Sequence, residues 1–93
     1  MENEFYATGK RKRASARTWI APGKGTITIN KRPLEDFFKL ETDRMALVQP
    51  FVLTNTMGDY DVRVTVKGGG TTGQAGAIRH GITRALILVN PDF

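Results

Sequence analysis

Three consecutive glycines, Gly68-Gly69-Gly70, are the residues of this chain best placed for chemistry. They follow a strand expected over Asp61–Lys67 and open an expected helix that runs toward Val89 with small and basic residues on one face. A turn without side chains at the start of a helix leaves backbone N–H groups free to meet an anion. The stretch therefore predicts a phosphate-binding surface with cations beside it.

The same glycines also match motifs of nucleotide-binding enzymes. Gly68–Gly73 fits G-x-G-x-x-G, but that fingerprint needs a further strand and an acidic residue about 20 positions on. Asp92 lies near that distance, and no strand is expected to carry it. A P-loop needs Lys and then Ser or Thr after the last glycine, where Gln74-Ala75 stand. A nucleotide-using enzyme is the weakest hypothesis, and tight binding of ATP or NAD would be needed to support it.

A basic run near the start of the chain, Lys10-Arg11-Lys12-Arg13, is the second candidate site, and Arg17 follows it. Taken alone, such a run is equally typical of a solvated edge or a nuclear localisation signal. Gly9 directly before the run and a second basic cluster favour nucleic acid instead. Clustered Lys and Arg neutralise phosphates and release counterions, which gives affinity without sequence choice. The members of the second cluster are Lys67, Arg79 and Arg84.

The charge of the chain agrees with a polyanionic partner. The 93 residues carry a net charge of +5, and the pI is near 10.0. The net charge is +6 over residues 1–32, −4 over residues 33–61 and +3 over residues 62–93. Such a polarised molecule is expected to present one face to the polyanion and another to solvent or protein.

Length and residue types limit the remaining classes. A chain of this size is expected to form one domain, residues 1–93, and its 40% hydrophobic and 25% charged residues are typical of a globular protein. There is no cysteine for a disulfide or a zinc site, and no cofactor is expected. No apolar run approaches the roughly 20 residues that span a bilayer, and the first residues do not resemble a signal peptide. A soluble, cytoplasmic protein without a membrane partner is expected.

Valines alternate with polar residues over Asp61–Lys67, which makes this the clearest strand. Two more strands flank Pro22–Gly25, a turn of hairpin length. The expected fold class is α+β, with a small, mostly antiparallel sheet and helices on one side. The further expected elements are strands at Ala16–Ala21, Thr26–Ile29, Phe5–Thr8 and Phe51–Thr54, and short helices at Leu34–Phe38 and Asp43–Val48, the latter ending before Pro50.

The last helix is expected to have two faces. An apolar stripe that should lie on the sheet is formed by Ala75, Ile78, Ile82, Ala85, Leu86 and Val89. The opposite face holds Gly73, Gly76, Ala77, His80 and Arg84, with Arg79 and Thr83 at its border. Each glycine inside a helix costs about 1 kcal/mol relative to alanine, and a close approach of another backbone would explain that cost.

The remaining candidates favour binding over catalysis. His80 is the only histidine, so it cannot build a metal site alone, and no spacing indicates a Ser/His/Asp arrangement. Trp19 could stack on a base, but in a small domain it is more typical of the core, where we place it. No strand carries the aromatic signature of an RNA-recognition motif.

The segment Gly70–Leu86, GTTGQAGAIRHGITRAL, closely resembles the signature of the family of the ninth protein of the small ribosomal subunit. Within it, Gln74-Ala75-Gly76 and Arg79-His80-Gly81 are similar to the bacterial or organellar branch. Shorter matches cover most of the remaining chain: Thr8–Lys12, Ala16-Arg17, Pro22–Gly25, Ile29-Asn30, Pro33-Leu34 and Val66–Gly68.

The resemblance implies a four-stranded sheet with helices on one face and a left-handed β-α-β crossover, as in the second domain of the fifth small-subunit protein. It implies a non-enzymatic structural protein that supports translation. The partners would be small-subunit ribosomal RNA, in the 3′ major domain of the subunit head, and neighbouring ribosomal proteins. The location would be the cytoplasmic ribosome, or the matrix for an organellar source. The alternative is a free-standing module that binds structured RNA outside the ribosome.

The expected RNA-binding residues combine the basic run, the glycine turn and the polar side of the last helix. They are Lys10, Arg11, Lys12, Arg13, Arg17, Lys67, Gly68, Gly69, Gly70, Gln74, Arg79, His80 and Arg84. Members of the resembled family continue into a long basic tail that reaches the tRNA in the peptidyl site. This sequence ends at Asn90-Pro91-Asp92-Phe93, so a tRNA contact is expected of none of its residues.

Overall fold

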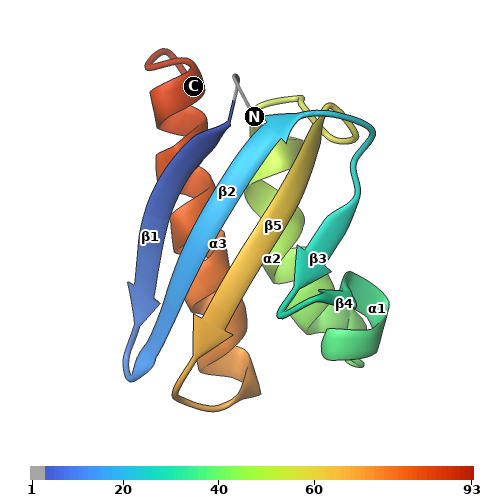
Figure 1. Cartoon of the computed structure of the whole chain (residues 1–93), viewed down its shortest axis with the longest axis vertical. Helices are drawn as coiled ribbons and strands as arrows, with labels where there is room; N and C mark the ends of the chain where they lie inside the picture. Colours follow the sequence, from blue (N-terminus) through green and yellow to red (C-terminus); the bar gives the residue numbers. More distant parts are fainter. Residues whose placement is uncertain (1–3) are drawn as a thin grey trace.

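The computed structural model describes residues 4–93 and shows an α+β fold in which α2 and α3 cover one face of a twisted sheet (Figure 1). Five strands form the sheet in the order β1-β2-β5-β3-β4. Every strand pair is antiparallel except β3 and β5, which are parallel. The elements are β1 (Phe5–Arg11), β2 (Ala14–Pro22), β3 (Ile27–Ile29), β4 (Arg32–Pro33), α1 (Leu34–Phe37), α2 (Glu41–Leu53), β5 (Tyr60–Lys67) and α3 (Thr71–Val89).

The sheet has one strand more than the four that the resemblance implies. The chain reverses at Asn30 and Lys31, whose φ angles of 50° and 67° are those of a tight type I′ hairpin turn. Arg32–Pro33 then pairs with β3 as β4. A strand of two residues is too short to show an alternation of apolar and polar residues, so the sequence does not indicate it. Its proline is tolerated because β4 lies at the edge of the sheet.

The turn at Pro22–Gly25 does not close a hairpin, so that prediction is wrong. β5 lies between β2 and β3 and pairs with both. The valines of β5 that alternate toward the helices, Val62, Val64 and Val66, are all buried. A central position covers this apolar row more completely than an edge position would, and it favours β5 over a direct β2–β3 pair.

Helix α2 is longer than the predicted Asp43–Val48, and the predicted strand at Phe51–Thr54 is wrong because its first three residues are helical. Pro50 lies inside the helix instead of ending it. Leu47 and Phe51 are buried on either side of this proline, so packing holds the last turn in place. The amide of Thr54 donates to the carbonyl of Pro50 at 3.1 Å and closes that turn.

Helix α3 packs its predicted apolar stripe inward. Ala75, Ile78, Ile82, Ala85 and Leu86 are buried, and Val89 is partly buried. Ala77, which the sequence placed on the opposite face, is also fully buried, so that placement is wrong. The reason is that β1 and β2 approach the helix along a second line of small residues. A side chain on Gly9 would meet the Ala77 carbonyl and the Gly81 amide, and one on Gly81 would meet the Thr18 hydroxyl.

Trp19 does not lie in the core, because odd-numbered residues of β2 point away from the helices. It is half-buried on the open face of the sheet, in register with Tyr6 on β1 and Arg63 on β5. The Arg63 guanidinium lies 4.1 Å from the centroid of the Trp19 ring, and the Tyr6 ring lies 5.0 Å from it. Guanidinium and ring cover the indole in place of a second layer of helices.

Candidate nucleic-acid interface

The basic run and the glycine turn meet at one end of the molecule. Lys12 and Arg13 form the turn between β1 and β2, and Lys12 has a positive φ of 55°. Gly68 and Gly69, at the end of β5, have φ angles of 78° and 66°, a conformation that favours glycine. A side chain on Gly68 would meet the Arg13 carbonyl. The two motifs that the sequence singled out thus form one surface, here named the basic tip (Lys12, Arg13 and Gly68–Gly70).

The start of α3 offers unpaired donors beside the basic tip. Gly70 caps the helix without a side-chain hydrogen bond, and the first turn holds no acidic residue. Within residues 4–93, the amides of Thr71–Gly73 have no hydrogen-bond partner, and the first paired amide is that of Gln74, which donates to the Gly70 carbonyl at 2.9 Å. The Gln74 side-chain amide donates to the Gly68 carbonyl at 3.2 Å and braces the turn. This arrangement is suited to bind an anion.

The predicted cations are divided between two sides of the sheet. Lys10, Ser15 and Lys67 stand in one row across β1, β2 and β5, and Arg17 stands in the next row. By alternation with buried neighbours, Arg17 and Lys67 point from the open face, away from α3, and Lys10 lies at the sheet edge. The predicted residues on the helix side or at the basic tip are Arg11, Lys12, Arg13, Gly68, Gly69, Gly70, Gln74, Arg79, His80 and Arg84.

Arg11 reaches across the outer side of α3. A Cβ on Gly76 would lie 2.9 Å from Cγ of Arg11, so the missing side chain of the glycine makes room for the arginine stem. This explains Gly76 through packing within the chain. The exposed guanidinium is thereby held near Arg79 and His80, in a shallow hollow that these three residues line together.

The side chains of His80 and Arg84 form hydrogen bonds with backbone groups on the unpaired edge of β1. The His80 Nδ1 accepts a hydrogen bond from the Lys10 amide at 3.2 Å. One helical turn later, the Arg84 guanidinium donates to the Thr8 carbonyl at 2.9 Å and contacts its hydroxyl at 3.3 Å. Four residues of helix rise about 6 Å, close to the rise of two residues of strand, so the two side chains match the spacing of the free edge groups. Because Nδ1 accepts, the neutral ring carries its hydrogen on Nε2.

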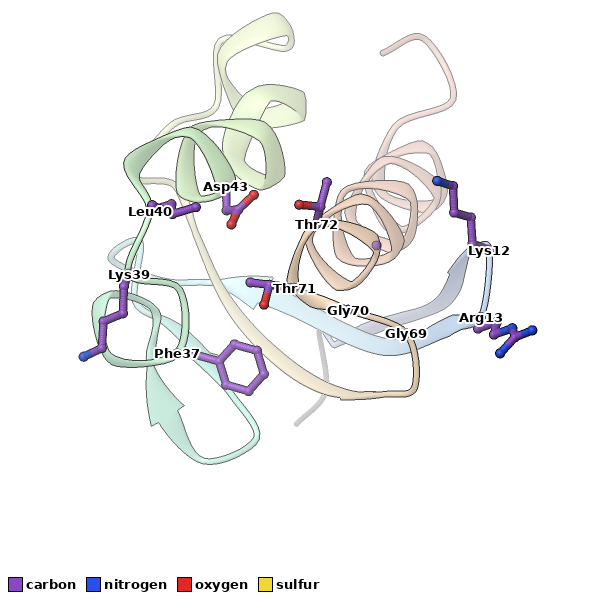
Figure 2. A pocket seen from close by; sticks show the side chains of 11 residues that line it. Lys12, Arg13, Phe37, Lys39, Leu40, Asp43, Gly69, Gly70, Thr71 and Thr72 are labelled. Atoms are coloured by element: carbon purple, nitrogen blue, oxygen red, sulfur yellow. The ribbon is translucent and has the colours of Figure 1, made fainter.

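A cavity of about 770 Å³ opens between the basic tip, α1 and the starts of α2 and α3; we name it the α3 cavity (Figure 2). Its lining residues are Lys12, Arg13, Phe37, Lys39, Leu40, Asp43, Gly69, Gly70, Thr71, Thr72 and Gly73. The lining residues that were not among the predicted site residues are Phe37, Lys39, Leu40, Asp43, Thr71, Thr72 and Gly73. Most of them lie in the acidic segment, residues 33–61, which the charge distribution associates with the face away from the polyanion. Only the fold brings them to the cavity.

At the opposite end of the sheet, the carboxylate of Asp61 holds the loop between β2 and β3. Asp61 Oδ1 accepts hydrogen bonds from the amides of Lys24, Gly25 and Thr26 at 2.9–3.1 Å. The amide of Thr26 first, then those of Lys24 and Gly25 and the charge of Lys24, hold the pKa of Asp61 below its ordinary value of 3.8, although desolvation acts in the opposite direction. The loop between β2 and β3 is thus fixed far from the basic tip (Figure 1).

Two further classes of site receive no support from the described part of the chain. No group of three or more His, Asp or Glu residues there could hold a metal ion. None of its helices combines the length and the apolar character that a membrane span requires. The interface that remains is the basic tip with the α3 cavity and the outer side of α3.

Comparison with known proteins gives consistent matches over nearly the whole chain. The profile of the family described as ribosomal protein S9/S16 matches residues 9–93. The small ribosomal subunit protein uS9 of Syntrophobacter fumaroxidans is 58% identical over 92 residues, which cover 99% of this chain and 71% of that protein. The uS9 proteins of Rickettsia bellii and Rickettsia canadensis are each 54% identical and are covered over 54% and 56% of their lengths. The chain therefore spans little more than half of some relatives.

Proposed function

The chain belongs to the ribosomal protein S9/S16 family, whose members are non-enzymatic structural constituents of the small ribosomal subunit, and we propose that it binds ribosomal RNA of the subunit head. The observation that carries this proposal is the meeting of the Lys12-Arg13 turn with the glycine turn at the start of α3. Cations and free amides at one end of a rigid fold form a surface for RNA phosphates. Residues 1–93 would act as a single RNA-binding domain.

The RNA-contacting residues follow from which groups remain unpaired. The side chains of Lys12 and Arg13 and the amides of Thr71–Gly73 have no hydrogen-bond partner within residues 4–93 and are assigned to phosphates. His80 and Arg84 are partly committed to the β1 edge, so they would contact RNA only with the donors they have left. Lys67 and Arg17 would contact RNA that passes the open face, because they project from there.

The wider setting follows from family membership. The partners would be the 3′ major domain of small-subunit RNA and neighbouring ribosomal proteins, and the location would be the ribosome. Contact with the peptidyl-site tRNA is assigned to no residue of this chain. The crossover from β3 through α1 and α2 to β5 is proposed to be left-handed, as the resemblance implies.

Chemical footprinting of small-subunit RNA with and without the chain tests the proposal. We expect protection confined to the 3′ major domain and lost in the double variant Lys12→Ala/Arg13→Ala. Lys24→Ala removes an exposed cation at the other end of the sheet and is the control, which should keep the footprint. Absence of protection for the unaltered chain would refute binding. Protection without co-sedimentation with small subunits would support the free-standing module instead.

A further inference from the structure

The α3 cavity has a cationic end. Lys12 and Arg13 lie on one side of the start of α3 (Figure 2) and are exposed, and Thr71–Gly73, whose amides are unpaired within residues 4–93, line the same cavity. Anions are stabilised at the first turn of a helix, and two guanidinium or ammonium groups strengthen that preference. This end of the cavity suits a phosphate.

Its other end holds a buried acceptor without a donor. Asp43, in the first turn of α2, is only 7% exposed, and its Oδ2 has no hydrogen-bond partner within residues 4–93. Figure 2 shows the carboxylate turned toward the space between α2 and the first turn of α3. Buried polar atoms without partners are rare in folded proteins and are explained when a bound group supplies the missing bond. A ligand with N–H or O–H donors would supply the missing bond at this end.

Apolar side chains lie beside Asp43, on the side of the cavity away from Lys12 and Arg13 (Figure 2). The half-buried Phe37 ring and Leu40 line the cavity from the side of α1 (Figure 2). The volume of about 770 Å³ falls within the roughly 300–1,000 Å³ typical of small-ligand sites. A flat group with apolar faces can stack on such a ring, as unpaired bases do on aromatic side chains.

We propose that the α3 cavity holds one unpaired guanosine nucleotide of the bound RNA. Its phosphate lies at the amides of Thr71–Gly73, on the side of Lys12 and Arg13, its base packs on Phe37, and its Watson–Crick edge donates to Asp43. Guanine presents two adjacent donors, N1–H and N2–H, on one edge, and a carboxylate can accept both. Adenine and the pyrimidines lack this pair. The proposal rests on the RNA binding proposed above and adds to it a preference for one base at one position.

Short single-stranded oligouridines that contain one guanosine, one inosine or no purine test the base preference with the unaltered chain. Inosine lacks only the N2 amino group, so the ligand changes while the protein does not. We expect the guanosine oligomer to bind about tenfold more tightly than the inosine oligomer, the scale of one hydrogen bond to a carboxylate. In amide NMR spectra, the signals of Thr71–Gly73 should shift on binding. Equal affinity for all three oligomers, or no shift at these amides, would overturn the proposal.

Asp43→Asn tests the assigned acceptor. It should reduce the guanosine preference to less than about twofold with little change in melting temperature, since the carboxylate loses no hydrogen bond and only its interaction with the dipole of α2. Asp36→Asn removes an exposed carboxylate on α1 with the same change in charge and should keep the full preference. A preference that survives in folded Asp43→Asn would overturn the proposal. Footprinting of complete small-subunit RNA separates the two proposals, because a normal footprint without guanosine preference refutes only the cavity.

Discussion

Replacing Gly81 with alanine should destabilise the fold, although alanine is the better helix former. The close packing of α3 on β1 and β2 is the reason. A Cβ on Gly81 would lie 3.2 Å from Cβ of Thr18 and 3.4 Å from the amide nitrogen of Gly9, and it would collide with the Thr18 hydroxyl. These neighbours are a strand backbone and a short side chain that is fully buried, so they cannot move aside.

The magnitude follows from two opposing contributions. Glycine to alanine inside a helix gains about 1 kcal/mol, and an overpacked methyl group in a rigid contact typically costs about 1–3 kcal/mol. Gly81→Ala should therefore lose about 1 kcal/mol. A Cβ on Gly73 meets nothing closer than the Arg11 carbonyl at 3.7 Å, so Gly73→Ala should gain up to about 1 kcal/mol. The two variants should differ by about 2 kcal/mol, or roughly 8–16 °C in melting temperature.

Thermal and urea unfolding of the single variants, followed by circular dichroism, measure this difference. Gly76→Ala should fall between the two, because the group it meets is the flexible side chain of Arg11. Thr18→Ala introduced together with Gly81→Ala removes the colliding hydroxyl and should restore part of the loss. The reasoning is refuted if Gly81→Ala is as stable as Gly73→Ala, or if Thr18→Ala gives the same change with and without Gly81→Ala.

Three further outcomes are expected. The pKa of Asp61 is lowered in the folded state, so the ionised carboxylate stabilises the fold fully above about pH 4, and this contribution is lost as the pH falls through the folded pKa. Asp61→Asn should therefore make the melting temperature less dependent on pH in the acid range. Arg84→Ala leaves the Thr8 carbonyl without its guanidinium partner and should cost about 1 kcal/mol in urea unfolding, whereas Arg79→Ala, on the same helix, should not, because the exposed Arg79 side chain makes no hydrogen bond within residues 4–93. RNA affinity measured by filter binding should fall steeply between low and physiological salt, and a flat profile would contradict phosphate binding.

The sequence predicted those parts of the fold in which a periodic pattern of apolar residues faces the core along the whole element. Alternation in Asp61–Lys67 gave β5 because one face of that strand is buried along its length. The stripe through Ile78, Ile82 and Leu86 gave the inner side of α3 for the same reason. The sequence also placed the glycine turn at the start of α3 correctly, since glycine followed by a helical pattern marks such a boundary.

The errors arose where a tertiary neighbour decided the outcome. Pro50 normally ends a helix, but the burial of Leu47 and Phe51 holds α2 through it. The turn after β2 has hairpin length, yet β5 takes the place beside β2 because its valines bury more surface in the centre. Trp19 shares the parity of Ser15 and Arg17 in β2, so it lies on the open face, although its large apolar ring favoured the core.

The candidate site was predictable in its charges and not in its cavity. Composition associated basic residues far apart in sequence with RNA, and the glycine turn with phosphate, and these assignments stay predictions. Asp43 could not be assigned, because an acid in the first turn of a helix is ordinarily explained by the helix dipole. Its missing partner is visible only once α2 and α3 are packed together.

The close contact at Gly81 also explains why side chains of α3 can hydrogen-bond to the edge of β1. Since no side chain separates the helix from Gly9, the helix axis lies near enough for His80 to reach the Lys10 amide directly. An uncovered edge strand is a template for pairing with another chain, and the two side chains occupy the edge groups that such a strand would use. A wider separation at Gly81 would move His80 and Arg84 away together. The glycines of α3 therefore act through protein packing at Gly81 and Gly76, and the start of the helix is the part proposed to bind RNA.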